Sequence, residues 1–298
     1  MADIKLFNIK GTVNEYPSGT VTLEKELQTV IENNMNTFFG VTFLASEYRT
    51  TDGGRMDSLG IDENHCPVIF EFKRSIKENV INQGLFYLNW LLDHKDSFKV
   101  LVIERLGLDA ANDIDWTMPR VVCVAGDFTK YDESAIKQMN RNISLIRYRK
   151  FGDALLMFEQ VNENIAEAIP DTAPPAVKVK TAYKTFDEQL AVADKSIKVL
   201  YQNLADYVLS LGDDISENHL KLYAAFKKIK NVITVVAQKK KLVVNLPLDT
   251  ATVAFEDGFS RDVSSLGHWG CGAVELHLQN SKDLEKAKPL IDRAYNEN

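Results

Sequence analysis

The sequence contains few cysteines and no long hydrophobic run. Its three cysteines, Cys66, Cys123 and Cys271, are odd in number and far apart, which argues against a disulfide framework and is typical of a reducing compartment. No stretch approaches the roughly 20 apolar residues that a membrane-spanning helix needs. The N-terminus also lacks the charged and apolar segments of a secretion signal. We therefore expect a cytoplasmic protein that has no membrane partner.

An excess of positive charge is also missing, because 35 Lys and Arg residues oppose 42 Asp and Glu residues, for a net charge of -7. This average argues against binding of a polyanion, since basic side chains supply most non-specific affinity for nucleic acid. The charge is nevertheless segregated along the chain. Seven lysines and no acid lie between Lys221 and Lys241, and five basic residues and no acid lie between Lys137 and Lys150. Lys239, Lys240 and Lys241 are our candidates for contact with nucleic acid.

The length of 298 residues and the hydrophobic content of 45% favour two globular domains. In the first, residues 1–161, hydrophobic periodicity predicts helices and a mixed sheet, with an antiparallel meander of three strands. The overall pattern is that of an α/β domain. The predicted helices cover 22–38, 77–92 and 131–141, and the predicted strands cover 41–50, 55–62, 67–74, 99–104 and 120–126.

Residues 162–183 lose this periodicity and hold three of the eight prolines, which is typical of a linker. The second domain, residues 184–298, is predicted to be a smaller α+β domain that binds nucleic acid or a partner. Its predicted helices cover 185–211, 216–230 and the segment from Ser281 onward, and its predicted strands are two within 233–248 and one at AVELHLQ.

One stretch of the first domain carries residues suited to metal chemistry. Asp57 lies on one predicted strand, and Glu71 and Lys73 lie on the next, separated by a single residue. Strand alternation places Glu71 and Lys73 on the same face, and a tight turn brings Asp57 alongside them. Two carboxylates and the carbonyl of Phe72 are hard oxygen ligands that suit Mg²⁺ or Mn²⁺. Lys73 can orient a nucleophile or stabilise charge on a phosphoryl group.

This D-x13-E-x-K pattern resembles the PD-(D/E)xK nuclease superfamily, which implies a restriction-endonuclease-like fold and metal-dependent hydrolysis of phosphodiester bonds in DNA. Gln83 and Tyr87, four residues apart on the next helix, resemble the Q-xxx-Y element of the RecB-type branch. The resemblance implies that both side chains position the scissile strand. The family's proline does not precede Asp57, where Met56 stands instead.

The first 150 residues also resemble the catalytic domain of NucS-type endonucleases, whose G-R-x-D motif matches Gly54, Arg55 and Asp57. This resemblance adds Arg55 as a candidate contact for nucleic acid. It also implies an acidic residue on the first helix. Glu24 is our choice for this position, and Glu26 and Glu32 are alternatives.

Other functions stay open. A nuclease-like module without catalysis, which binds nucleic acid or a protein, is favoured by the acidic net charge. His268, Cys271 and His277 are close in sequence and could be zinc ligands, but a fourth ligand is missing. The sequence does not decide between DNA and RNA, or whether the protein acts as a homodimer.

Overall fold

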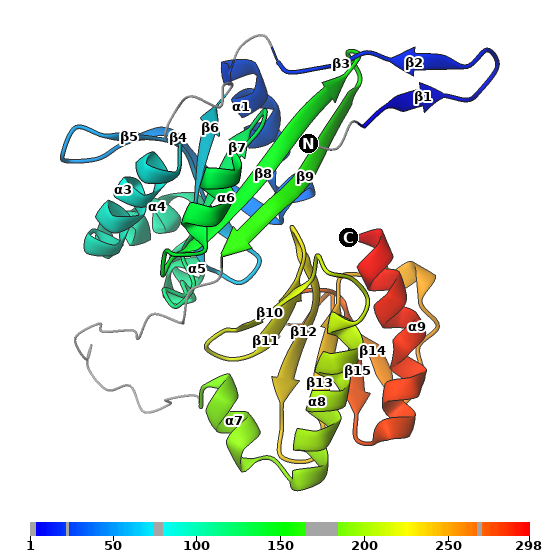
Figure 1. The fold of residues 1–298 in the computed structure, drawn as a ribbon. Helices are drawn as coiled ribbons and strands as arrows, with labels where there is room; N and C mark the ends of the chain where they lie inside the picture. Colours follow the sequence, from blue (N-terminus) through cyan, green and yellow to red (C-terminus); the bar gives the residue numbers. More distant parts are fainter. Residues whose placement is uncertain (1–3, 22–23, 74–79, 165–183, 267–269) are drawn as a thin grey trace. The chain divides into compact units, whose positions relative to one another are not determined.

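The computed structural model of the protein describes residues 4–21, 24–73, 80–164, 184–266 and 270–298. Contacts divide the chain into two compact units: the first comprises Met1–Ile114 and Met118–Glu167, and the second Asp115–Thr117 and Ala168–Asn298. The ribbon in Figure 1 runs from blue to green through the first unit and from yellow-green to red through the second. The first three residues of the predicted linker, 162–164, form the end of a strand. Its remaining residues, 165–183, lie outside the described residues.

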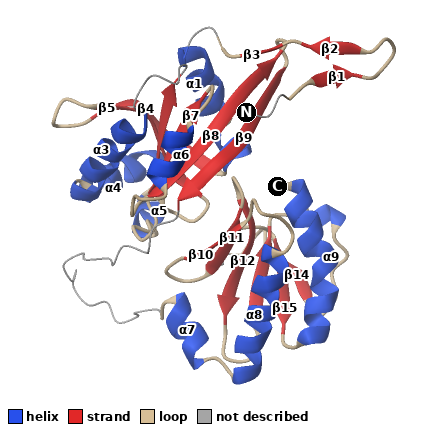
Figure 2. Cartoon of the chain, viewed as in Figure 1, coloured by secondary structure: helices blue, strands red, loops and turns tan. Residues whose placement is uncertain are grey.

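A mixed sheet forms the framework of the N-terminal unit (Figure 2). Within the described ranges its strand order is β3-β8-β7-β6-β5-β4, and β9 pairs with β8. Strands β4, β5 and β6 form the antiparallel meander that the sequence predicts, whereas β7 is parallel to both β6 and β8. The strands are β3 (Ser18–Gly19), β4 (Val41–Arg49), β5 (Arg55–Asp62), β6 (Pro67–Lys73), β7 (Arg120–Ala125), β8 (Asn142–Phe151) and β9 (Leu155–Asn164).

Helices pack against this sheet because their apolar residues recur at helical spacing. Helix α1 contacts β4, β5 and β6, and α3 contacts β5, β6 and β7. The predicted helix 22–38 is interrupted at Asn34, and α2 ends at Gly40, whose φ of 62° is left-handed. A separate hairpin of β1 (Leu6–Asn8) and β2 (Asn14–Tyr16) precedes the sheet. The helices are α1 (Glu24–Asn33), α2 (Met35–Phe39), α3 (Val80–Asp93), α4 (Lys95–Leu106), α5 (Leu108–Asn112) and α6 (Lys130–Ile136).

Two predictions for this unit were wrong. The segment 99–104 is not a strand but part of α4, which buries Phe98, Leu101 and Val102 at helical spacing and leaves Val100 and Ile103 exposed. The predicted helix 131–141 ends at Ile136, because the chain enters β8 at Asn142. Strands β8 and β9 were not predicted at all.

The C-terminal unit is an antiparallel sheet with helices packed on it, which confirms a distinct second region. Within the described residues its strand order is β10-β11-β12-β13-β15-β14. Its core joins side chains of α8 and α9 to alternate residues of the strands, such as Val235, Val244 and Leu276. The strands are β10 (Ser216–His219), β11 (Ala224–Lys227), β12 (Asn231–Ala237), β13 (Leu242–Leu246), β14 (Ser260–Asp262) and β15 (Val274–Leu278); the helices are α7 (Phe186–Val192), α8 (Lys195–Leu209), the 3-10 turn η1 (Thr250–Thr252) and α9 (Ser281–Glu297).

Two predictions for this unit were also wrong. The predicted helix 216–230 is the hairpin of β10 and β11, in which Ala224 and Phe226 are buried in the core. The predicted helix 185–211 is divided into α7 and α8 at Ala193 and Asp194. The two strands within 233–248, the strand at AVELHLQ and the final helix are present as predicted. None of the described helices is long and apolar enough to cross a membrane.

Candidate functional site

The predicted acidic pair lies where two central strands of the N-terminal sheet meet. The register of β5 and β6 pairs Ser58 with Phe70, so continuing it by one residue sets Asp57 opposite Glu71. Two hydrogen bonds fix this arrangement: the Phe72 N–H donates to Asp57 Oδ2 over 2.9 Å, and the Asp57 N–H donates to Glu71 Oε1 over 3.3 Å. Each carboxylate is therefore held by the backbone of the other strand.

Both carboxyl groups are removed from solvent. Asp57 is 8% exposed and Glu71 is fully buried, and no partner among the described residues bonds Glu71 Oε2. Burial, and then the charge of Asp57, raises the pKa of Glu71 to about 9. Burial also raises the pKa of Asp57, against the opposing hydrogen bond from Phe72 and the charge of Lys73. Such shifts are frequent at catalytic sites, although structural ion-pair networks also produce them.

Lys73 shares this environment. Its charge lowers the pKa of both Asp57 and Glu71, as expected for a side chain on the same face of β6. The intervening Phe72 is fully buried, and on the same side of the strand Phe70 packs against Phe39 of α2 with ring centroids 5.2 Å apart. Alternation along β6 thus separates an apolar face from a face that carries Glu71 and Lys73.

Helix α1 directs three polar side chains, spaced four residues apart, toward the site strands. Glu24 Oε1 lies 3.7 Å from Lys73 Nζ. Gln28 is buried, and its Nε2 donates to the carbonyl oxygen of Asp57 over 2.8 Å. Glu32 Oε1 accepts from Ser58 Oγ over 2.6 Å. We call Glu24, Gln28 and Glu32 the α1 stripe.

The contacts of helix α1 distinguish the three glutamates that were alternatives for the acidic residue of the first helix. Glu24 is the one that contacts Lys73, whereas Glu32 bonds to Ser58 and to the Gln28 amide. Glu26 points elsewhere, because its carboxylate lies 3.7 Å from Lys150 Nζ. Gln28 was missed by the sequence analysis; its position four residues after one glutamate and four before another could have revealed it.

Gln83 and Tyr87 lie on one face of α3, as their spacing predicts. Tyr87 is buried, and its hydroxyl accepts a hydrogen bond from the backbone N–H of Arg55 over 3.1 Å and lies 3.4 Å from Gln83 Nε2. These contacts tie α3 to the start of β5. Arg55 itself is exposed, and its guanidinium pairs with Glu47 Oε2 at 2.6 Å.

Glu47 on β4 is a further acidic residue near the site that the sequence did not single out. Its φ of 54° lies in the left-handed region, which a non-glycine residue adopts rarely. Its carboxylate pairs with Lys25 and Arg55, and its charge raises the pKa of Asp57. Nothing in the sequence pattern signals this backbone conformation.

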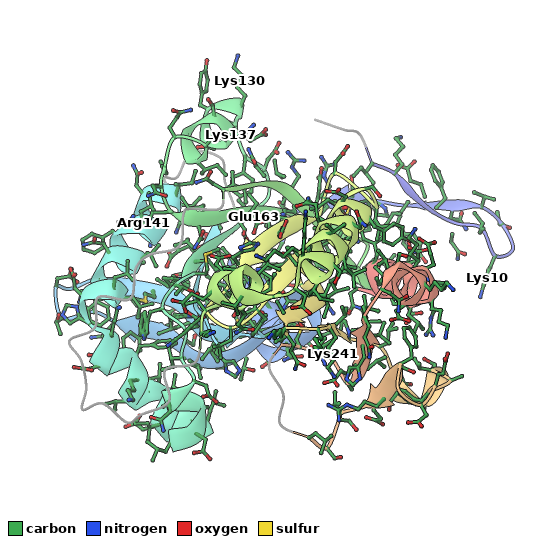
Figure 3. All side chains as sticks on the ribbon, turned by 90° about the horizontal axis from the view of Figure 1, so that it is seen from below. Lys10, Lys130, Lys137, Arg141, Glu163 and Lys241 are labelled. Atoms are coloured by element: carbon green, nitrogen blue, oxygen red, sulfur yellow. The ribbon has the colours of Figure 1, made fainter. Side chains whose placement is uncertain are left out.

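The lysine-rich and arginine-rich segments are less uniformly exposed than their sequence suggests. Lys137 projects from the end of α6 (Figure 3), whereas Arg147 is buried between Asp127 and Glu159, at 2.7 Å from each. In the second unit Lys227 is buried and Lys228 pairs with Asp214. Lys239 and Lys240 are exposed and Lys241 is half-buried, in the turn between β12 and β13. Basic residues that cluster in the sequence are therefore only partly exposed together on the surface.

The chemistry of the acidic pair fits a metal that takes few protein ligands. No described group of three or more His, Cys, Asp or Glu side chains is arranged to hold a metal ion. Mg²⁺, however, commonly binds through one or two carboxylates and completes its shell with water and phosphate oxygens. Glu71 Oε2, buried and without a partner in the described chain, fits that role, and Asp57 and the Phe72 carbonyl are its neighbours. Of the alternative zinc ligands, His268 lies outside the described residues and His277 bonds to Glu275.

Comparisons with known proteins give a family match for part of the chain, a relative of similar length and a solved structure. Residues 186–298 match the family described as Domain of unknown function (DUF5655). The chain is 29% identical over 300 residues to an uncharacterized protein of Haemophilus influenzae, covering 98% of this chain and 99% of that one. Among solved structures it is similar to a repair endonuclease from Pyrococcus abyssi, with a TM-score of 0.30 and 18% identity. That match covers 43% of this chain and 49% of the endonuclease chain, so this chain spans about half of it.

Proposed function

We propose that the N-terminal unit is a restriction-endonuclease-like domain that hydrolyses phosphodiester bonds, in DNA, with Mg²⁺ or Mn²⁺. The observation that carries this proposal is the pair of buried carboxylates of Asp57 and Glu71 on adjacent strands, beside Lys73. Burying two acids side by side costs free energy. A divalent cation would offset that cost, because its charge would compensate both carboxylates, and the unsatisfied Oε2 of Glu71 would be available to hold it.

The roles of the residues follow from their contacts. Asp57 and Glu71, with the Phe72 carbonyl, would hold the metal, which when bound activates a water molecule and neutralises charge on the phosphate. Lys73 would stabilise the phosphoryl oxygens or orient the attacking water. Glu24 would hold the Lys73 ammonium in place, since the two lie 3.7 Å apart. Gln83 and Tyr87, which hold the start of β5, would position the scissile strand of the substrate. Arg55, which is exposed and pairs with Glu47, would contact the phosphate backbone.

The metal site is tested first, without a substrate. Calorimetric titration of Mn²⁺ into the wild type and into Asp57→Ala should give binding that is lost in the variant. Asp52→Ala, in the exposed turn before β5, is the matched control and should bind as the wild type does. Equal binding by wild type and Asp57→Ala would refute the metal site.

Catalysis is tested next, on single-stranded, duplex and branched DNA. Lys73→Ala should abolish metal-dependent cleavage and leave the melting temperature nearly unchanged, because a polar site residue at the end of a strand adds little to core packing. Glu24→Gln should reduce cleavage and Glu26→Gln should not, since Glu24 contacts Lys73 whereas Glu26 pairs with Lys150. If the wild type binds metal but cuts none of these substrates, the module that binds nucleic acid without cleaving it becomes the better proposal.

A further inference from the structure

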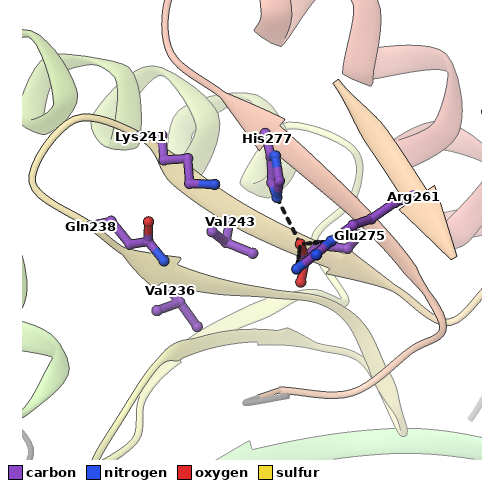
Figure 4. A pocket seen from close by; sticks show the side chains of 7 residues that line it. All are labelled: Val236, Gln238, Lys241, Val243, Arg261, Glu275 and His277. Atoms are coloured by element: carbon purple, nitrogen blue, oxygen red, sulfur yellow. Dashed lines mark hydrogen bonds and ion pairs between the residues drawn. The ribbon is translucent and has the colours of Figure 1, made fainter. Parts of the chain in front are cut away.

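The C-terminal sheet carries a pocket on the face opposite its helices. Residues such as Val235, Val244 and Leu276 point into the helix-covered core, so their neighbours along the same strands point the other way. These outward-pointing residues line an open pocket of about 170 Å³ (Figure 4). Its lining residues are Val236, Gln238, Lys241, Val243, Arg261, Glu275 and His277.

A buried carboxylate organises this pocket. Glu275 is 3% exposed, and its Oε1 accepts from Arg261 Nε over 2.6 Å and bonds to His277 Nε2 over 2.7 Å. Burial alone would raise the pKa of Glu275, but these partners lower it, so the carboxylate stays ionised. Figure 4 shows both contacts converging on one oxygen. Glu275 thereby fixes the positions of a guanidinium and an imidazole at the wall of the pocket.

Positive charge exceeds negative charge here. Arg261 and Glu275 balance each other, which leaves Lys241 as an additional cation in the lining. Across the described residues, the ammonium of Lys241 has no ion-pair partner, and neither do those of Lys239 and Lys240 in the same turn. The lining of the pocket thus carries an excess of positive charge at the half-buried Lys241. The pocket is therefore suited to an anion.

The size and the lining narrow the choice of anion. A cavity of about 170 Å³ is below the range of about 300–1,000 Å³ for drug-sized ligands, so it fits a terminal group. Arg and Lys together are common partners of phosphate oxygens. Val236 and Val243 add an apolar surface beside these cations, against which a sugar or base can pack.

We propose that this pocket binds a terminal phosphate group, carried by the end of a nucleic acid or by a free nucleotide. Lys241 and the free edge of the Arg261 guanidinium contact the phosphate oxygens, and Gln238 contacts the attached nucleoside. Glu275 and His277 are positioning residues that hold Arg261 in place. This assignment does not depend on catalysis in the N-terminal unit, because it uses residues of the C-terminal unit alone.

The test measures binding to the full chain in EDTA, so that no cleavage occurs. The probes are a 12-nucleotide single strand with a 5′-phosphate, the same strand with a 5′-hydroxyl, thymidine 5′-monophosphate and thymidine. We expect each phosphorylated probe to bind at least about tenfold more tightly than its unphosphorylated partner, since one charge-assisted contact contributes roughly that factor. A greater preference with the strand assigns the pocket to nucleic-acid ends, and a greater preference with the mononucleotide assigns it to free nucleotides.

Two variants separate the pocket from general charge. Lys241→Gln should remove the preference for phosphate, and Lys240→Gln, which deletes the same charge from an exposed neighbour outside the lining, should keep it. Arg261→Lys retains the charge but not the planar guanidinium, and should also weaken the preference. The proposal is overturned if the wild type shows no preference for phosphate, or if Lys240→Gln removes it as completely as Lys241→Gln does.

Discussion

Replacing Glu71 by glutamine should make the N-terminal unit more stable and inactive. The glutamate has an ordinary pKa of 4.5 and a folded-state pKa of about 9, so the folded protein binds the proton more tightly than the unfolded chain does. Stability therefore falls as the pH rises from about 4.5 to 9, by about 1.4 kcal/mol per pH unit. At pH 7 the accumulated cost is about 3 kcal/mol. The neutral amide avoids this cost and can still accept the hydrogen bond from the Asp57 N–H.

Hydrogen exchange of peptides from β5 and β6, followed by mass spectrometry in EDTA, measures this difference within the N-terminal unit alone. The gain should be up to about 3 kcal/mol at pH 7, because the amide's own burial subtracts from it. It should be larger at pH 8 and disappear below pH 4.5. Glu26→Gln, on an exposed side chain, should change nothing. Equal protection of wild type and Glu71→Gln at pH 8 would show that burial of Glu71 imposes no electrostatic cost.

Three further predictions concern packing, charge and pH. Gly84→Ala should lower the free energy of unfolding by about 1–3 kcal/mol in thermal melts, because the added Cβ would lie 2.4 Å from Val121 Cγ1. This steric clash should outweigh the higher helix propensity of alanine. Replacing Lys239–Lys241 by glutamine should weaken binding of nucleic acid and flatten its dependence on log salt by about 0.7 to 0.9 for each phosphate that the lysines no longer neutralise; an unchanged slope would mean a merely solvated surface. His219→Gln should destabilise the second unit most between pH 4.5 and 6.5, by no more than about 1 kcal/mol for these half-exposed groups. The contact with Glu217 raises the pKa of His219 above 6.5, so the stabilisation from the charged histidine is lost as the pH rises through that raised pKa. The same contact lowers the pKa of Glu217 below 4.5, so the stabilisation from the charged glutamate is lost as the pH falls through that lowered pKa. Urea unfolding that shows the same difference at pH 5.5 and pH 9 would contradict this reasoning.

Elements whose burial follows a simple period were predictable from the sequence. The meander β4 to β6 and the final helix α9 agree with the predicted ranges. The segment KVLVIE shows where this reasoning fails. Its β-branched residues favour a strand. Helix α4, however, buries only Leu101 and Val102 of this segment, and tertiary packing outweighs the local preference. The hairpin of β10 and β11 was also missed, although β11 pairs with β12, the strand that follows it directly in the chain.

The arrangement of the strand residues in the candidate site was predictable, whereas their surroundings were not. Strand alternation alone places Glu71 and Lys73 on one face, and a short turn brings Asp57 of the preceding strand beside them. The partners of these residues depend on how α1 and β4 pack, which no local pattern specifies. Gln28 and Glu47 were overlooked for this reason, and the choice between Glu24 and Glu32 depended on contacts with Lys73 and Ser58.

The α1 stripe links one helix to both site strands through three contacts. Glu24, Gln28 and Glu32 stand on successive turns, and each contacts β5 or β6. A turn of the helix by one residue, about 100°, would break all three contacts together. Their contributions should consequently be strongly coupled: double-mutant cycles between Glu24 and Glu32, about 12 Å apart along the helix axis, should show interaction energies that side chains so far apart normally lack. Breaking one of these interactions would weaken the others, so that a substitution at Glu32, two turns from Glu24, would alter the contact of Glu24 with the Lys73 ammonium.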